Sequence, residues 1–331
     1  MLFRSGVIHL SEPFSHSLKP ELFKKVDKSG FPVRPGNQVY LLEGLYLHRF
    51  LGLSDEGINI GELKHQRMDI KLDINRLFNK HLAILAQSGA GKSYLISVVL
   101  EGLLLRKEDC GTPAMVLFDV HGEYRYLAEN IGLETGEEKC NPLNQEDYYR
   151  MQRKVHHYNA SFLQIGVPSL SEYDIQRYQP SISFPQLREL RKAIQFCRQK
   201  FAGAETGYDL KDLIFTLNDD PDINPKVKET LVSWLVDLDH MGIFNKYEAP
   251  TLKELVKVGE LSIIDFSSIV SMRAKQIILH YFTSRMFNAR RNSKISPFII
   301  FLEEAHNLIP ESGDKGAIAK NIFEKIGRAN V

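Results

Sequence analysis

The sequence has few cysteines, no excess of either charge and no long apolar run. Its 331 residues include only three cysteines, Cys110, Cys140 and Cys197, with no Cys-x-x-Cys pair, which favours a reducing, cytoplasmic setting over a structural zinc site. Lysine and arginine total 42 and aspartate and glutamate 41, so any contact with DNA must come from a local patch. No stretch approaches the roughly 18 apolar residues of a membrane helix, and the first residues show no signal-peptide pattern. We therefore expect no membrane association.

Four short apolar runs alternate with helical spacing and predict a parallel α/β sheet covered on both faces. The predicted strands are His81–Ala86, Ala114–Asp119, Leu261–Asp265 and Pro297–Leu302. Helices are expected at Tyr94–Arg106 and Met272–Phe287. Together they indicate one α/β domain over residues 73–331.

Two regions depart from this alternation. Residues 1–72 predict a small β-barrel or sandwich, with short β elements at Val39–Leu42, Leu45–Leu51, Gly61–Leu63 and Met68–Ile74. Between about residues 141 and 249 the strand signal fades, and Gln186–Phe201 and Val227–Leu238 have helical spacing. This middle region is interpreted as a largely helical insertion.

A phosphate-binding loop follows the first predicted strand. The segment Ala86–Ser93 fits the pattern GxxxxGK[ST] except that Ala86 replaces the first glycine. Gly89 and Gly91 allow backbone N–H groups to point at phosphate oxygens, and the following helix adds the positive end of its dipole. Lys92 would reach the β- and γ-phosphates, and the Ser93 hydroxyl would bind Mg²⁺. The predicted nucleotide-binding residues are Gln87, Ser88, Gly89, Ala90, Gly91, Lys92, Ser93 and Tyr94.

Acidic residues follow the other predicted strands. Glu303 and Glu304 end the strand Pro297–Leu302, where open α/β sheets bind ligands. We assign Glu303 to the metal and Glu304 to the general base that activates water; the alternative is that the pair caps the next helix. Asp119, His121 and Glu123 follow a second strand and could reach the same crevice, but by their chemistry alone an ordinary turn around Gly122 is the better explanation. Asp265 has the same ambiguity.

Two basic clusters and a histidine pair complete the candidate residues. The clusters are Arg188, Arg191, Lys192, Arg198 and Lys200 in the insertion, and Arg285, Arg290, Arg291 and Lys294 before the last strand. Either could contact phosphates, but a solvated helix face is the favoured interpretation. His156 and His157 lack partners at metal-ligand spacing and are interpreted as surface residues.

Four segments, in order, resemble the HerA family of hexameric P-loop translocases, within the wider HerA/FtsK group: HLAILAQSGAGKS, LFDVHGEY, LSIIDFS and FIIFLEEAHNLIP. The resemblance runs from about Met68 to Val331. It implies an N-terminal β-barrel joined to a RecA-like (ASCE) core, and a homo-hexamer that hydrolyses ATP with Mg²⁺ to move on double-stranded DNA. It further implies a nuclease partner of the NurA type in DNA repair, or another effector in antiviral defence.

The resemblance also implies roles for single residues. It places Asp119 near the nucleotide as a further metal ligand and Glu123 beside it in catalysis, and it makes Arg328 a sensor arginine in cis. Lys80 stands where the family commonly has the arginine finger that acts on a neighbouring subunit, and Arg76 is a nearby candidate. The family core continues beyond the point where this chain stops, so we expect this chain to hydrolyse ATP poorly.

Two other functions fit the same residues. One is a P-loop ATPase of the conjugation or secretion type, which the lack of an apolar membrane run disfavours. The other is a nucleotide-gated scaffold ring that organises an effector nuclease. A motor needs both Lys92 and Glu304, whereas a scaffold that only binds ATP needs Lys92 alone.

Overall fold

The computed structural model describes residues 43–64, 66–79, 81–87, 89–107, 111–128, 145–203 and 207–309, together with 318 and 323. The chain divides into two compact units, Met1–Gly102 and Leu103–Val331. The domain boundary expected after residue 72 stays a prediction.

The first unit contains α1 (Gly44–Leu51), an antiparallel pair of strands, β1 (Ile58–Glu62) and β2 (Asp69–Leu72), then α2 (Ile74–Phe78) and the start of α3 (Lys92–Leu104). The β elements expected near Gly61 and Met68 are confirmed by this pair. Residues Val39–Leu42 lie outside the described residues, and the described part of the unit does not form a barrel.

The β element expected at Leu45–Leu51 is wrong, because this segment is the helix α1. Gly52 ends the helix in a left-handed conformation (φ 67°), and its N–H bonds back to the carbonyls of His48 and Arg49. These two basic residues also suit the negative end of the helix dipole. Gly52 is thus the C-cap of a helix.

The strand expected at His81–Ala86 is also wrong. Residues 81–87 form neither strand nor helix, and the side chains of Leu82 and Leu85 are 49% and 91% exposed. An apolar run becomes a strand only when another strand supplies hydrogen bonds to its backbone. In the described part of the first unit, β1 and β2 pair with each other and not with this segment.

The second unit is built on a four-stranded parallel sheet with the order β4-β7-β3-β8. The strands are β3 (Ala114–Asp119), β4 (Val155–Asn159), β7 (Leu261–Asp265) and β8 (Phe298–Leu302). The two central strands are buried throughout, as their continuous apolar runs predict, whereas β8 at one edge is half-buried. The parallel α/β prediction is confirmed for three of its four expected strands.

The edge strand β4 corrects the extent of the insertion. Its sequence, VHHYN, lies inside the region expected to be helical, yet it pairs in register with β7. An edge strand has one hydrogen-bonded neighbour and a solvated side, so its sequence can be polar and lacks the apolar run of a central strand. Apart from α4 (Gln145–Gln152), the helices of this region therefore follow β4.

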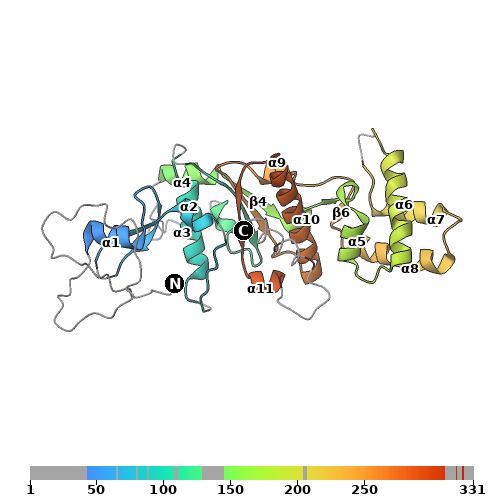
Figure 1. Ribbon diagram of the computed structural model, residues 1–331, viewed down its shortest axis with the longest axis horizontal. Coiled ribbons are helices and arrows are strands. Elements are labelled where there is room, and N and C mark those ends of the chain that lie inside the picture. The colour runs from blue at the N-terminus through green and yellow to red at the C-terminus, as the bar shows by residue number, and fades with distance from the viewer. Residues whose placement is uncertain are drawn as a thin grey trace, which may run out of the picture. The chain divides into compact units, whose positions relative to one another are not determined.

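Four helices form this insertion: α5 (Glu172–Tyr178), α6 (Phe184–Lys200), α7 (Leu210–Asp219) and α8 (Pro225–Asp239). Their starts follow local rules. Reciprocal capping bonds link Ser171 with Asp174 and Asp209 with Asp212, and Asn224 caps α8 directly before Pro225. Figure 1 shows α6, α7 and α8 grouped together.

Short elements connect these parts. They are η3 (Arg125–Leu127), α4 (Gln145–Gln152), η4 (Ala160–Phe162), β5 (Ile165–Gly166), η5 (Val167–Ser169), β6 (Phe244–Asn245), α9 (Leu252–Leu255) and α11 (Ala305–Leu308). The strands β5 and β6 pair in parallel, so the chain enters and leaves the insertion at one place. No helix among the described residues is long and apolar enough to cross a membrane.

The long helix α10 (Met272–Arg291) joins the insertion to the sheet. One apolar cluster contains alternate residues of β3 (Ala114, Val116 and Phe118), buried residues of α10 and the inner faces of α6, α7 and α8.

Within this cluster, Tyr281 of α10 makes a polar link: its hydroxyl lies 2.8 Å from Glu248 Oε2 and 2.9 Å from Ser169 Oγ. Arg285 holds the same glutamate with two N–H groups, at 3.0 and 3.3 Å. Burial first, and then the charge of Glu248, raise the pKa of Tyr281, so its hydroxyl stays protonated.

Replacing Tyr281 with phenylalanine tests this polar link. We expect Tyr281→Phe to lower the free energy of unfolding by about 1–3 kcal/mol, because Glu248 and Ser169 lose a buried partner. The matched control is Tyr173→Phe, which removes an exposed hydroxyl bonded to Arg191 and should change the free energy of unfolding by less than about 0.5 kcal/mol. Urea denaturation measures both, and equal effects would contradict the assignment.

Candidate active site

The glycine-rich turn of the first unit stands directly before α3. Gly89 and Gly91 have φ angles of +77° and +84°, and the Ala90 N–H donates to the Gln87 carbonyl at 3.1 Å. A Cβ added to either glycine would meet no atom within 4 Å, so it is the backbone conformation that requires glycine here. Ser88 lies outside the described residues.

Helix α3 begins at Lys92, as the loop motif predicts. The first intrahelical bond at this end runs from Leu95 N–H to the Gly91 carbonyl at 2.9 Å, and Ser97 Oγ donates to the Ser93 carbonyl at 2.9 Å. The N–H groups of a first helical turn have no acceptor within the helix and face outward with the positive end of the dipole. Lys92 and Ser93 are half-buried beside them, whereas Tyr94 is 74% exposed.

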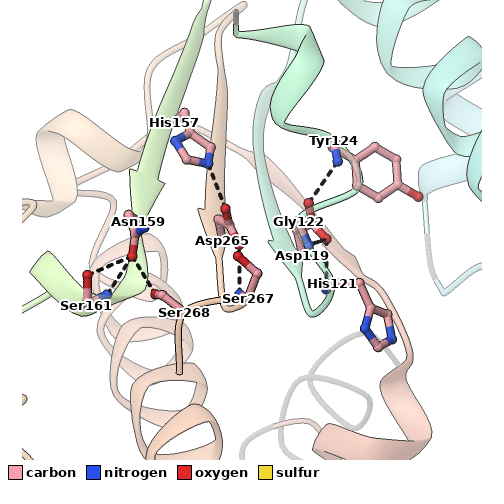
Figure 2. Close-up of polar contacts among 10 residues, drawn as sticks. All are labelled: Asp119, His121, Gly122, Tyr124, His157, Asn159, Ser161, Asp265, Ser267 and Ser268. Carbon is pink, nitrogen blue, oxygen red and sulfur yellow. Dashed lines mark hydrogen bonds and ion pairs between the residues drawn. The ribbon is translucent and has the colours of Figure 1, made fainter. Parts of the chain in front are cut away.

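In the second unit, strand register collects the acidic residues at one edge. Asp119 of β3 is paired with Asp265 of β7, which is paired with Asn159 of β4. On the other side, the Glu303 N–H donates to the Phe118 carbonyl at 3.2 Å, directly after β8. Residues at one level of a parallel sheet emerge on the same side. Figure 2 shows polar side chains and turns along this edge at the ends of β4, β7 and β3.

Asp119 shapes the turn that follows β3. Its carboxylate accepts N–H bonds from His121 at 3.2 Å, Gly122 at 2.8 Å and Tyr124 at 2.9 Å, and the side chain is completely buried (Figure 2). The His121 and Glu123 side chains are exposed on this turn. The contacts show Asp119 organising the loop; its expected role as a metal ligand stays a prediction.

Gly122 permits a close approach between the turn and β7. Its φ is +76°, and an added Cβ would lie 3.2 Å from Ser267 and 3.3 Å from Asp265 Oδ1. A side chain would therefore be strained in conformation and crowded against the neighbouring loop. The glycine that could be explained as an ordinary turn residue has this second, steric reason.

Asp265 is the centre of a polar group that the sequence did not reveal. Its carboxylate accepts from Ser267 N–H at 2.8 Å and lies 3.0 Å from His157 Nε2. Burial alone would raise the pKa of Asp265, but the hydrogen bonds from Ser267 and His157 outweigh it and hold the pKa below its ordinary value. Beside it, Asn159 Oδ1 accepts from Ser161 and from Ser268, whose Oγ lies at 2.6 Å. Figure 2 shows both groups side by side.

The expectation that His156 and His157 of β4 are ordinary surface residues is wrong, because each is partly buried against a carboxylate. His156 Nε2 lies 2.6 Å from Glu260 Oε2. His157, the next residue of β4, contacts Asp265 of β7. Successive residues of a strand point to opposite faces, so each histidine meets a different acid. Only the pairing of β4 with β7 brings these residues together, and no spacing in the sequence signals it.

The two glutamates after β8 differ in burial and conformation. Glu303 is 3% exposed, whereas Glu304 is half-buried and lies in the left-handed region, at φ 45° and ψ 44°. That conformation costs a residue other than glycine about 1–3 kcal/mol and is typical of functional sites. Glu304 also stands at the start of α11, but its side chain makes no capping bond there. His306 Nδ1 lies 3.4 Å from Glu304 Oε2.

The other expected residues are less fully placed. Lys80 and Arg328 lie outside the described residues. Arg76 is described in the first unit; its side chain is 75% exposed and lies 3.8 Å from Asp73. Among the described residues, no group of three or more histidine, cysteine, aspartate or glutamate residues could hold a metal ion by itself.

The basic cluster on α6 is largely satisfied within the chain. Arg188 and Lys192 both pair with Glu189, at 3.0 and 2.8 Å, and Arg191 pairs with Glu172 at 2.6 Å. These pairs support the solvated helix face over a phosphate-binding patch. Of the second cluster, Arg285 is held by Glu248.

Comparison with known proteins identifies similar chains. The family model described as "Helicase HerA, central domain" matches residues 58–286. The DNA double-strand break repair helicase HerA of Sulfurisphaera tokodaii is 26% identical over 292 residues, which cover 83% of this chain and 53% of that protein. The protein of the same name from Sulfolobus acidocaldarius is 26% identical over 341 residues, covering 96% of this chain and 62% of that one. The chain thus spans between about half and three-fifths of the length of these two relatives.

A solved structure of VirB4 from Thermoanaerobacter pseudethanolicus shares the fold. It matches with a TM-score of 0.54 and 15% identity, over 84% of this chain and 76% of that one. At this identity the likeness concerns the fold alone. It supports the parallel α/β architecture seen in the second unit.

The charge of Asp265 is expected to stabilise the fold in a pH-dependent way. Because the pKa of Asp265 is lowered in the folded chain, its contribution is present above its ordinary pKa and is lost as the pH falls through the lowered value. Asp265→Asn should therefore cost about 1–3 kcal/mol of unfolding free energy at pH 7, and this difference should shrink toward about pH 3. Urea denaturation at both pH values measures it. The exposed control Asp222→Asn should show a small difference at both; a deficit for Asp265→Asn that does not change with pH would contradict the assignment.

Proposed function

Because the chain belongs to the family of the HerA helicase central domain, we propose that it is a P-loop ATPase that drives movement on double-stranded DNA. Two features, each within its own unit, support the proposal: a glycine turn that opens a helix at Lys92, and two adjacent glutamates at the carboxyl edge of a parallel sheet. One feature suits phosphate binding, and the other suits activation of water. We propose that both act on one ATP.

The glycine turn would bind the triphosphate. Backbone N–H groups of the turn and of the first turn of α3 would donate to phosphate oxygens, helped by the helix dipole. Lys92 would neutralise the β- and γ-phosphates. Gln87, Ser88, Gly89, Ala90 and Gly91 would supply backbone contacts, and the exposed ring of Tyr94 is free to lie against the nucleotide.

The donor chemistry fits Mg²⁺. The Ser93 hydroxyl and the Glu303 carboxylate offer the oxygen ligands that Mg²⁺ prefers, with phosphate oxygens and waters as the remaining ligands. When bound, the ion would offset the negative charge that develops on the phosphates.

Glu304 would take the proton from the attacking water. It follows β8 in a left-handed backbone conformation, and His306 Nδ1 lies 3.4 Å from its carboxylate. Glu303, almost fully buried, is less accessible to water than Glu304. In the same proposal Asp119 holds the turn that carries Glu123 toward the nucleotide, Arg328 senses it in cis, and Lys80 or Arg76 acts on a neighbouring subunit.

The assembly and its partners belong to the same proposal. The relatives named HerA are DNA double-strand break repair helicases, and a ring of six copies around duplex DNA would explain why a protomer of net charge +1 needs no strongly basic face. A nuclease or other effector would act with the ring, in DNA repair or in antiviral defence. A scaffold ring that needs only bound ATP is the alternative.

Two substitutions separate nucleotide binding from hydrolysis. Lys92→Ala should abolish ATP binding, since the phosphates lose their main counter-charge. Glu304→Gln should bind ATP as the wild type does but hydrolyse it at least about 100-fold more slowly, since an amide cannot accept the proton. Titration with a fluorescent ATP analogue and phosphate release measure the two steps.

Matched controls are Lys64→Ala and Glu229→Gln, which alter exposed residues of the same types. Both should bind and hydrolyse as the wild type does. Normal ATP binding by Lys92→Ala would contradict the proposal. Duplex-dependent function that survives Glu304→Gln but not Lys92→Ala would favour the scaffold.

A further inference from the structure

A groove with a volume of about 440 Å³ lies on the insertion, lined by α6, by α7 and by the segment that follows α7. Two aromatic side chains line it, Phe196 from α6 and Phe215 from α7, and they are 53% and 60% exposed. Behind them, Ala193 and Leu217 are buried. Two neighbouring exposed rings over a buried apolar floor form a patch, which single scattered apolar residues do not. We call this surface the α6–α7 groove.

Charges of both signs border the α6–α7 groove at separate places. The Lys200 ammonium lies 6.0 Å from the centre of the Phe215 ring, and among the described residues no carboxylate pairs with it. Asp219 and Asp220 follow Phe215 by about one helical turn, at the end of α7. The remaining charges, Lys192 and Glu189, pair with each other at 2.8 Å. The groove therefore has a cationic place, an apolar centre and an acidic place.

We propose that the α6–α7 groove is a self-association surface, in which it meets the same groove of a second copy across a two-fold axis. In a two-fold contact the same surface of both copies meets, so this surface must be complementary to itself in shape and charge. Turning one copy around brings Lys200 of each chain toward Asp219 and Asp220 of the other, with the phenylalanine rings packed between them. One surface thus supplies both the apolar contact and two opposite-charge contacts.

Other occupants fit these charges less well. A nucleic acid strand could stack on the rings, but its phosphates would meet Asp219 and Asp220. A peptide of one charge sign would leave either Lys200 or the two aspartates unpaired against apolar surface. The second copy needs no further partner, because its charges are already arranged for the contact.

The apolar centre is tested first. Sedimentation velocity without nucleotide should show wild-type chains associating as their concentration rises toward about 100 μM, a range suited to a weak contact. Phe215→Ala should weaken this association at least about tenfold, since each dimer loses two central rings. The control Phe184→Ala removes another exposed ring of α6, 82% exposed and outside the groove, and should leave association unchanged.

A charge exchange tests the geometry. Lys200→Glu, and Asp219→Lys combined with Asp220→Lys, should each weaken self-association, because acids then face acids and cations face cations. An equal mixture of the two variants should associate as strongly as the wild type, because both opposite-charge contacts form again between unlike chains. Association through another face, such as that of a ring, would persist in every variant and would not depend on mixing.

The outcomes separate this proposal from the proposed ATPase. Lys92→Ala should self-associate as the wild type does, because no nucleotide takes part. A wild type that stays monomeric at about 100 μM, groove variants that associate normally on their own, or a mixture that fails to recover would each overturn the proposal. Failure of ATP binding alone would leave it standing.

Discussion

Two backbone hydrogen bonds at the carboxyl edge of the sheet hold the candidate catalytic segments of the second unit in one row. Phe266 N–H donates to the Asp119 carbonyl at 2.8 Å, and Glu303 N–H donates to the Phe118 carbonyl at 3.2 Å. These two bonds continue the pairing of β3 with β7 and with β8 by one residue beyond the ends of those strands. Three loops that are distant along the chain therefore start at one level, and their acidic side chains emerge on one side of the sheet.

The acids at this edge divide two tasks between them. Asp119 and Asp265 are buried, and each accepts backbone N–H groups of its own loop. These contacts fix the conformation of the loops, and in Asp265 the bonds from Ser267 and His157 hold the pKa below its ordinary value. Glu304 sits instead in a strained left-handed conformation with its carboxylate half-buried. A strained residue beside these buried carboxylates supports the proposed role of Glu304 in activating water.

The insertion follows a different physical rule from the sheet. Its helices begin at side-chain caps, such as Ser171 and Asn224, that bond backbone groups only two or three residues away. Its inner faces share one apolar cluster with α10 and β3, and a polar link through Tyr281 and Glu248 ties it to the place where the chain enters and leaves. The insertion is thus locally specified but anchored by contacts between distant residues.

Sequence-based prediction of the helices, strands and turns succeeded where the deciding interactions are local, or where they do not depend on which strand is the neighbour. Continuous apolar runs predicted the two central strands correctly, because central strands of a covered parallel sheet are buried on both faces. The glycines before Lys92 announced the loop, because their φ angles demand glycine. In contrast, β4 was missed and residues 81–86 were wrongly expected to be a strand, because edge strands and unpaired runs depend on which neighbour supplies hydrogen bonds.

Composition and motif spacing were therefore enough for the fold class, the glycine turn and the pair of glutamates. The contacts of His157 with Asp265 and of Asn159 with Ser268, and the left-handed turn at Glu304, came only from the folded chain. The two contacts join residues of different strands or loops, and the turn is a matter of backbone geometry. A residue pattern does not show which distant segments become neighbours, because that depends on how the strands pair and in which register.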